Sequence, residues 1–282
     1  MGGVAVVTDS SADLPPELAE ERGIRVVPMY VTFGERSEIS GITIDHDTFY
    51  RRLAASERLP TTSQPAPPWF EEAYADCADD GLDAAVSLHV SAALSGTVDL
   101  ARDRAKEAPL PVEVVDTRLV GGSLGMSVLR AQRIAAAGGS VQEVVAAAEE
   151  VTRRSVSLLV VDTLEYLKRG GRLTGTQAAV GSVLRVKPLL HLVDGRVEVR
   201  ERTRTWARAL DRVAEIIAET AAGGPADVVV THAVAPDRAA EAWQRIQERV
   251  EVRDRLEAVI GPIVGTHVGP GAIGVAAMPA AP

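Results

Sequence analysis

Four short segments combine hydroxyl, histidine or arginine side chains with glycine or proline, and these residue types suit the binding of an anion. The first is TTSQP at residues 61–65, which places three hydroxyls and an amide just before Pro67-Pro68. The prolines can begin a helix, and the free backbone N–H groups of its first turn can join the hydroxyls in holding a carboxylate or phosphate. An ordinary helix cap explains the same residues, and on this segment alone that simpler interpretation is favoured.

The second segment is LSGT at residues 94–97, which follows a predicted strand and precedes a helical pattern. In a sheet of parallel strands, ligands bind beyond the carboxyl ends of the strands. Gly96 would let a ligand approach the backbone, while Ser95 and Thr97 would supply hydroxyl donors. A capped helix without a ligand fits these residues equally well.

The other two segments lie in the second half of the chain. THVGPG at residues 266–271 contains His267, which can donate a hydrogen bond to an anion or simply close a hairpin. The literal GxGxxG at 269–274 is not a dinucleotide fingerprint, because it precedes a β-like run rather than a helix. In the basic turn KRGGRLTG at 168–175, Arg169 and Arg172 could steer an anion or an acidic partner, and a merely solvated turn is the simpler alternative.

Two enzyme classes can be tested against the sequence. A serine hydrolase could pair Ser95 with His267, but Ala93 and Thr97 occupy the glycine positions of the Gly-x-Ser-x-Gly elbow. For metal catalysis, the sequence has no HExxH motif and no histidines at helical ligand spacing, and its single cysteine excludes a CxxC site. A Walker A motif for nucleotide phosphates is also missing. The sequence leaves both enzyme classes open and supports neither, and we expect no metal site and no cofactor on this chain.

The composition indicates the general class of protein. A length of 282 residues, with 46% hydrophobic and 24% charged residues, fits a globular protein of about two domains. The formal net charge of −9 and the aromatic content of 4% argue against a nucleic-acid partner. No apolar run reaches the ~20 residues that cross a bilayer, and the N-terminus shows no basic leader. We therefore expect a cytoplasmic protein without a membrane-spanning segment.

Strand-like and helix-like segments alternate in the first half of the chain. Strands are predicted at residues 4–7, 24–33, 83–90 and 112–115. Helices are predicted from residue 15 onward, at 48–55, 67–78 and 98–107, and twice more before residue 152. Ser140 and Glu143 fit a capping box at the start of the last of these helices. The alternation predicts a mostly parallel sheet with helices on both faces.

The pattern of predicted strands and helices changes after residues 152–156. Strands are predicted at 157–161 and 227–231, and a hairpin at 189–201 turns on Asp194-Gly195, a pair typical of type I′ turns. Helical patterns cover 163–168, 175–184 and the surroundings of Trp206 and Trp243, and residues 263–278 form a β-like run. We therefore expect an α/β fold of two domains, 1–155 and 156–282. The second would have a mixed sheet with helices, and the ligand would lie between the domains.

The order of the motifs then points to a known family. TDSSADLP, PTTSQP, LSGT, GGRLTG with KPLL, and THVGPG follow one another over essentially the whole chain. In this order and spacing the sequence resembles the DegV family of bacterial fatty-acid-binding proteins. It is especially similar to members that serve a bacterial fatty acid kinase. The resemblance implies two α/β domains that enclose one long-chain fatty acid, such as palmitate.

The resemblance also implies roles for individual residues. Thr62 and Ser95 would hold the carboxylate, with Ser63, Gly96 and His267 close by. From the residues themselves we also predict Thr97 as a ligand-binding residue and Arg172 as a contact for the anion or a partner. The protein would be a non-catalytic carrier that presents the carboxylate to a separate kinase, which supplies ATP and metal, and that then carries the acyl-phosphate. The remaining alternatives are a small serine hydrolase using Ser95 and His267, and a lipid-sensing regulatory protein. SAA at residues 91–93 departs from the family's commoner residues before LSGT, which would leave the carboxylate site intact but remove one neighbouring hydroxyl.

Overall fold

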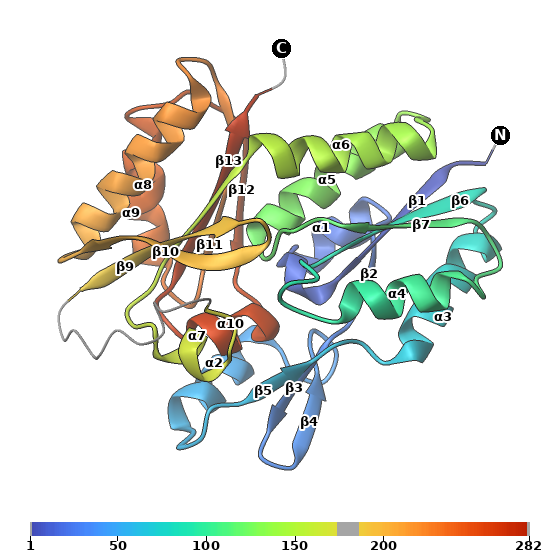
Figure 1. Ribbon diagram of the computed structural model, residues 1–282, viewed down its shortest axis with the longest axis horizontal. Coiled ribbons are helices and arrows are strands. Elements are labelled where there is room, and N and C mark those ends of the chain that lie inside the picture. The colour runs from blue at the N-terminus through green and yellow to red at the C-terminus, as the bar shows by residue number, and fades with distance from the viewer. Residues whose placement is uncertain (1, 174–185, 281–282) are drawn as a thin grey trace.

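The computed structural model describes residues 2–173 and 186–280, and the predicted helical segment at 175–184 falls outside them. The described chain folds around a four-stranded sheet, a six-stranded sheet and a small three-stranded sheet (Figure 1). The predicted α/β class, with one parallel and one mixed sheet, is confirmed.

The first sheet is built from apolar strands that pair in parallel, in the order β2-β1-β6-β7. They are β1 (Val4–Asp9), β2 (Arg25–Val27), β6 (Ala84–His89) and β7 (Val112–Asp116). All six residues of β6 are buried, as expected for a central strand covered on both faces. The carboxyl ends of β1, β6 and β7 therefore bring the loops that follow them to one edge of the sheet.

Helices cover both faces of this sheet. One face carries α3 (Pro67–Asp79) and α4 (Thr97–Ala105). Helix α1 (Pro16–Glu21) follows β1, and its Ala19 packs in the cluster on the other face. The other face carries α5 (Gly122–Ala136) and α6 (Val141–Arg154), and the predicted capping box of Ser140 and Glu143 begins α6. The same cluster of buried side chains continues into the second sheet through Val229, Ala276 and Met278.

The small sheet corrects one prediction. The predicted single strand at 24–33 is wrong, because β2 ends at Val27 and β3 (Tyr30–Phe33) pairs in a different sheet. Pro28 lies at the break, since it has no N–H to continue the ladder. Antiparallel partners of β3 are β4 (Arg36–Ile39) and β5 (Thr61–Ser63), and α2 (His46–Ala55) lies between those two strands in the sequence. Residues 61–63, expected as part of a helix cap, are therefore a strand.

The second sheet is mixed, in the order β10-β9-β8-β13-β11-β12. Its strands are β8 (Val156–Val160), β9 (Lys187–Val193), β10 (Arg196–Thr203), β11 (Ala226–His232), β12 (Val252–Val259) and β13 (Ile273–Pro279). Trp206 and Trp243 lie on α8 (Trp206–Ala221) and α9 (Pro236–Gln247), which pack on one face. Asp194 and Gly195 both have positive φ, 47° and 75°, as the predicted type I′ turn requires.

Two segments of the second half differ from the prediction. The run at 263–278 is not β-like throughout, because Pro262–Val268 forms α10 and only Ile273–Pro279 forms a strand. Pro262 is well placed in the first turn of a helix, and Gly269, with φ of 76°, ends it. Strand β12 was not predicted, because its side chains alternate between exposed and partly buried positions with few apolar residues to mark it.

The division into domains 1–155 and 156–282 stays a prediction. Helix α5 packs tightly against both of the larger sheets. Gly122 begins this helix, and a Cβ there would lie only 2.9 Å from side-chain carbons of Val229 and Thr231 in β11. In Figure 1, α5 and α6 run between the two larger sheets. The two halves of the chain are therefore held together by a shared helical layer.

Candidate functional site

One cavity lies where the two larger sheets, β5 and α10 meet. It has a volume of about 140 Å³, which leaves room for a molecule much larger than one water. The segments that follow β1, β6 and β7, together with the start of α5, supply part of its lining, namely Ser11, Asp13, Val90, Leu94, Ser95, Val120, Gly121, Gly122 and Ser123.

Polar side chains from distant parts of the chain gather on this lining. We call Thr62, Ser63, Ser95, Arg172 and His267 the polar cluster. Thr62 Oγ1 lies 2.8 Å from His267 Nε2, although 205 residues separate them in the sequence. Strand β5 positions the threonine and the last turn of α10 positions the histidine. The predicted site residues Thr62, Ser63, Ser95, Arg172 and His267 therefore all reach the same cavity.

The remaining two predicted residues, Gly96 and Thr97, are not part of this lining. Thr97 is fully buried at the start of α4, and its Oγ1 is 2.8 Å from Ser95 Oγ. Gly96 precedes the helix, and Gln64 Oε1 occupies the position that a side chain at 96 would need. The structure thus places Thr97 where it can orient the Ser95 hydroxyl. A direct contact of Gly96 or Thr97 with a ligand stays a prediction.

Arg172 connects two loops of the cluster. Its Nε donates to the carbonyl oxygen of Leu94 at 3.3 Å, and its Nη1 donates to that of Gly170 at 2.7 Å. The guanidinium is part-buried, and its positive charge lowers the pKa of His267. A cationic group beside neutral hydroxyls favours an anionic ligand.

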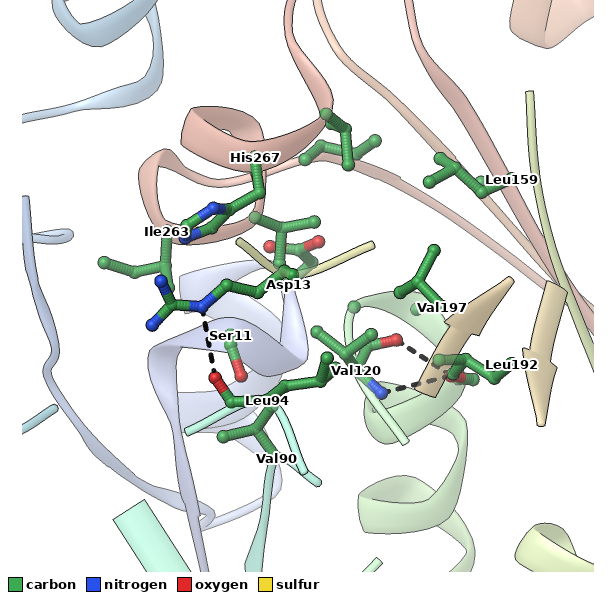
Figure 2. Close-up of a pocket in the computed structure, with 18 of the residues that line it drawn as sticks. Ser11, Asp13, Val90, Leu94, Val120, Leu159, Leu192, Val197, Ile263 and His267 are labelled. Carbon is green, nitrogen blue, oxygen red and sulfur yellow. Dashed lines mark hydrogen bonds between the residues drawn. The ribbon is translucent and has the colours of Figure 1, made fainter. Parts of the chain in front are cut away.

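Apolar side chains form the opposite side of the cavity. Figure 2 shows Leu159, Leu192 and Val197 together at the strands of the second sheet, across the cavity from His267. We call these three residues the apolar wall. Leu192 and Val197 are paired across the β9–β10 hairpin, so their side chains share one face. The cavity therefore carries the polar cluster on one side and the apolar wall on the opposite side.

Electrostatics keeps the histidine of the cluster neutral. Burial, and then the positive charge of Arg172, lower the pKa of His267 from 6.5 to about 4. Its Nδ1 is buried without a hydrogen-bond partner in the described residues, and Gly170 packs so closely that a side chain there would collide with the ring. At neutral pH the uncharged ring can therefore form a hydrogen bond with the Thr62 hydroxyl.

The pKa of His267 predicts an acid-sensitive contribution to stability. Because the pKa is lower in the folded state, unfolded chains bind more protons between pH 6.5 and about 4. The stabilisation from the neutral ring is complete above pH 6.5 and is lost as pH falls, by up to about 3 kcal/mol. Urea unfolding of wild type and His267→Gln from pH 7.5 to 4 measures this, since glutamine keeps a hydrogen-bonding group and does not titrate. Parallel pH profiles for the two proteins would contradict the assignment.

A buried network beneath the loops was not predicted. Asp9 and His89 are both completely buried, and Asp9 Oδ2 lies 3.0 Å from His89 Nδ1 and accepts from the Val90 N–H at 3.0 Å. The opposite carboxylate oxygen, Oδ1, accepts from the N–H and hydroxyl of Ser11. The network ties the loop after β1 to the loop after β6, both of which line the cavity. The TDSSADLP motif marked this position, but a sequence pattern gives no sign of a partner 80 residues away.

The geometry gives the hydrolase alternative no support. His89 Nε2 lies 2.7 Å from Ser87 Oγ, so Asp9, His89 and Ser87 have the order of a hydrolytic triad. All three are buried and none lines the cavity, so no substrate can reach them. Within residues 2–173 and 186–280, no hydrogen bond joins Ser95 to His267.

The described residues hold neither a candidate metal cluster nor a membrane-spanning helix. No cluster of three or more His, Cys, Asp or Glu side chains suited to a metal ion occurs among them. None of their helices is both long and apolar enough to cross a membrane.

Two β-sheets covered by helices surround one cavity, which carries the polar cluster on one side and the apolar wall on the other. This arrangement defines a protein that encloses a small molecule. The chain belongs to the DegV family, because the model described as "Uncharacterised protein, DegV family" matches residues 3–280. This confirms the resemblance seen in the motifs. A DegV domain-containing protein of Streptomyces coelicolor is 45% identical over 96% of this chain and 97% of its own length.

Solved structures agree with this assignment. A fatty-acid-binding DegV family protein from Thermus thermophilus superposes with a TM-score of 0.92 at 35% identity, over 99% of this chain and all of its own. DegV of Bacillus subtilis, also a fatty acid binding protein, gives a TM-score of 0.87 at 31% identity, over 99% of this chain and all of its own.

Proposed function

We propose that this protein binds one long-chain fatty acid, such as palmitate, in the cavity between its sheets. The observation that carries the proposal is the division of the cavity into a polar cluster and an apolar wall (Figure 2). A fatty acid has the same division, with a carboxylate at one end and an acyl chain behind it. The fatty-acid-binding proteins of similar fold add support.

The carboxylate belongs at the polar cluster. Thr62 and Ser95 supply hydroxyl donors, neutral His267 bonds Thr62, and Arg172 supplies positive charge nearby. A hydrogen bond to an ionised group contributes about 1.5–3 kcal/mol. Two or three such bonds fix the position of the carboxylate without requiring a permanent salt bridge.

The acyl chain belongs along the apolar wall, where burial supplies most of the affinity. Each buried CH₂ group contributes about 0.8 kcal/mol, so a 16-carbon chain gains on the order of 10 kcal/mol before ordering costs. This exceeds the contribution of the polar cluster. The cluster therefore determines where the carboxylate lies, and the wall determines how tightly the ligand is held.

Replacing Ser95 with alanine tests the carboxylate site. We expect Ser95→Ala to weaken palmitate binding by about 10- to 100-fold, because one charge-assisted hydrogen bond is lost. Isothermal titration of delipidated protein measures the change. Ser37→Ala, on β4 and away from the cavity lining, is the matched control and should bind like wild type. An unchanged isotherm for Ser95→Ala would show that the carboxylate lies elsewhere.

We further propose that the protein presents the bound carboxylate to a partner kinase in the cytoplasm. The kinase would bind ATP and metal, and the carboxylate oxygen would attack the terminal phosphorus of ATP, releasing ADP and leaving an acyl-phosphate on this non-catalytic carrier. Neutral hydroxyls around the carboxylate suit this role, since a tight cationic clamp would compete with the transfer.

A reconstituted reaction tests the presentation. Palmitate-loaded protein, the kinase and ATP should yield acyl-phosphate, and Ser95→Ala should lower the yield. A protein that binds palmitate but supports no transfer with any fatty acid kinase would instead fit a lipid sensor. Labelling of Ser95 by an active-site serine reagent would reopen the hydrolase alternative.

A further inference from the structure

Asp13 is a buried carboxyl group that the proposed carboxylate site does not use. It lines the cavity (Figure 2), and only 7% of its surface is exposed. Its Oδ1 accepts from the backbone N–H of Gly261 at 2.9 Å, the residue that precedes α10. Its Oδ2 has no hydrogen-bond partner among the described residues. A buried polar atom without a hydrogen bond lowers the stability of the fold, and a ligand that bonds this oxygen would remove that loss.

The surroundings of Asp13 keep a proton on it. Burial raises the pKa of Asp13 to about 8, the N–H of Gly261 opposes the rise, and the charge of Asp9 adds to it. Tyr50 on α2 interacts electrostatically with this carboxyl, and its hydroxyl donates to the carbonyl oxygen of Ile260. At neutral pH the side chain is therefore a carboxylic acid, whose O–H can donate a hydrogen bond to a neutral oxygen.

Asp13 lies at a different point of the cavity from the polar cluster. Its partner Gly261 precedes the first turn of α10, while His267 lies in the last turn. Six residues of helix correspond to about 9 Å along the axis. A ligand whose carboxylate is at His267 therefore meets Asp13 several carbons along its acyl chain.

On the basis of the proposed fatty-acid function, we propose that Asp13 is a second polar subsite that binds an oxygen substituent on the acyl chain. The preferred ligand class is then a long-chain fatty acid with a hydroxyl or oxo group near its middle. A plain acyl chain places CH₂ groups against Asp13 and leaves its donor unpaired. An oxygen at the matching carbon satisfies that donor, which corresponds to a preference on the order of tenfold.

A comparison of positional isomers tests the subsite. Dissociation constants are measured by titration for octadecanoate and for hydroxy-octadecanoates that carry the hydroxyl at successive carbons. In wild type, we expect a narrow range of positions to bind about tenfold more tightly than octadecanoate. Equal or weaker binding of every hydroxylated isomer would overturn the proposal, and this comparison needs no variant.

Two variants then assign the preference to Asp13. Asp13→Gly removes the carboxyl and tolerates the left-handed backbone at this position, where φ is 51°. It should bind all isomers with equal affinity, and a preference that persists in it would overturn the assignment. Asp13→Asn also tolerates this backbone, keeps an acceptor for Gly261 and supplies an amide donor, so it should retain the preference. Thermal unfolding verifies that both variants fold.

The same titrations separate the two proposals. If octadecanoate binds but no hydroxylated isomer is preferred, the subsite proposal fails and the fatty-acid function stands. If none of these acids binds to wild type, the proposed function fails and the subsite proposal fails with it.

Discussion

A Leu192→Trp variant should lose most of its affinity for palmitate while still binding a fatty acid of eight to ten carbons. Leu192 belongs to the apolar wall, across the cavity from His267, and an indole there fills the space that the end of a long chain needs (Figure 2). Excluding about six CH₂ groups removes roughly 5 kcal/mol, which corresponds to more than 1,000-fold in the dissociation constant. Short chains end before the wall and should lose little affinity.

Titration with saturated fatty acids of 6 to 18 carbons measures this shift in chain-length preference. Leu100→Trp is the matched control, because Leu100 lies on α4 and does not line the cavity. It should keep the wild-type preference. If Leu192→Trp binds palmitate as wild type does, the acyl chain does not reach the apolar wall.

Replacing Asp9 with alanine should cause the largest loss of stability among these variants, about 3–5 kcal/mol. The substitution leaves the His89 ring and the N–H groups of Ser11 and Val90 buried without their acceptor. Burial alone would raise the pKa of Asp9. The hydrogen bond and charge of His89, and the hydrogen bonds from Ser11 and Val90, hold this pKa below its usual value. The stabilisation from Asp9 is therefore present above about pH 4 and is lost as pH falls through its folded pKa.

Urea unfolding at pH 7 tests this prediction. Asp45→Ala is the control, because Asp45 is exposed and caps α2 by accepting from the Thr48 N–H at 2.7 Å. Loss of this cap should cost about 1 kcal/mol. Similar losses for the two variants would mean that the buried network contributes no more than an ordinary surface cap.

Local sequence signals predicted the elements whose stabilising contacts are short-range or strongly periodic. The strand around Val86 is buried throughout because both of its faces are covered, and Asp194-Gly195 specifies the hairpin turn by backbone conformation alone. The missed elements depend on tertiary context. Glycine-rich, β-branched residues hid α10, and the break at Pro28 separates two strands that join different sheets.

The candidate site was predicted as separate motifs, and the structure brings them together. Hydroxyls beside glycine in LSGT, and a histidine beside Pro-Gly, indicated anion binding at Ser95 and His267, which both line the cavity. Asp13 was missed because its environment depends on Gly261, a contact across 248 residues. Nor could the sequence show that Thr97 lies behind Ser95 rather than on the cavity wall.

The most direct test of the proposed function is the identity of the molecule that occupies the cavity of the purified protein. The protein is denatured and extracted with organic solvent, and mass spectrometry identifies and quantifies what is released. We predict close to one long-chain fatty acid per chain, and a hydroxylated acid among the products would agree with the subsite at Asp13. An empty extract, repeated after incubation with a panel of saturated, unsaturated and hydroxylated fatty acids, would contradict the fatty-acid function and assign the polar cluster to another anion.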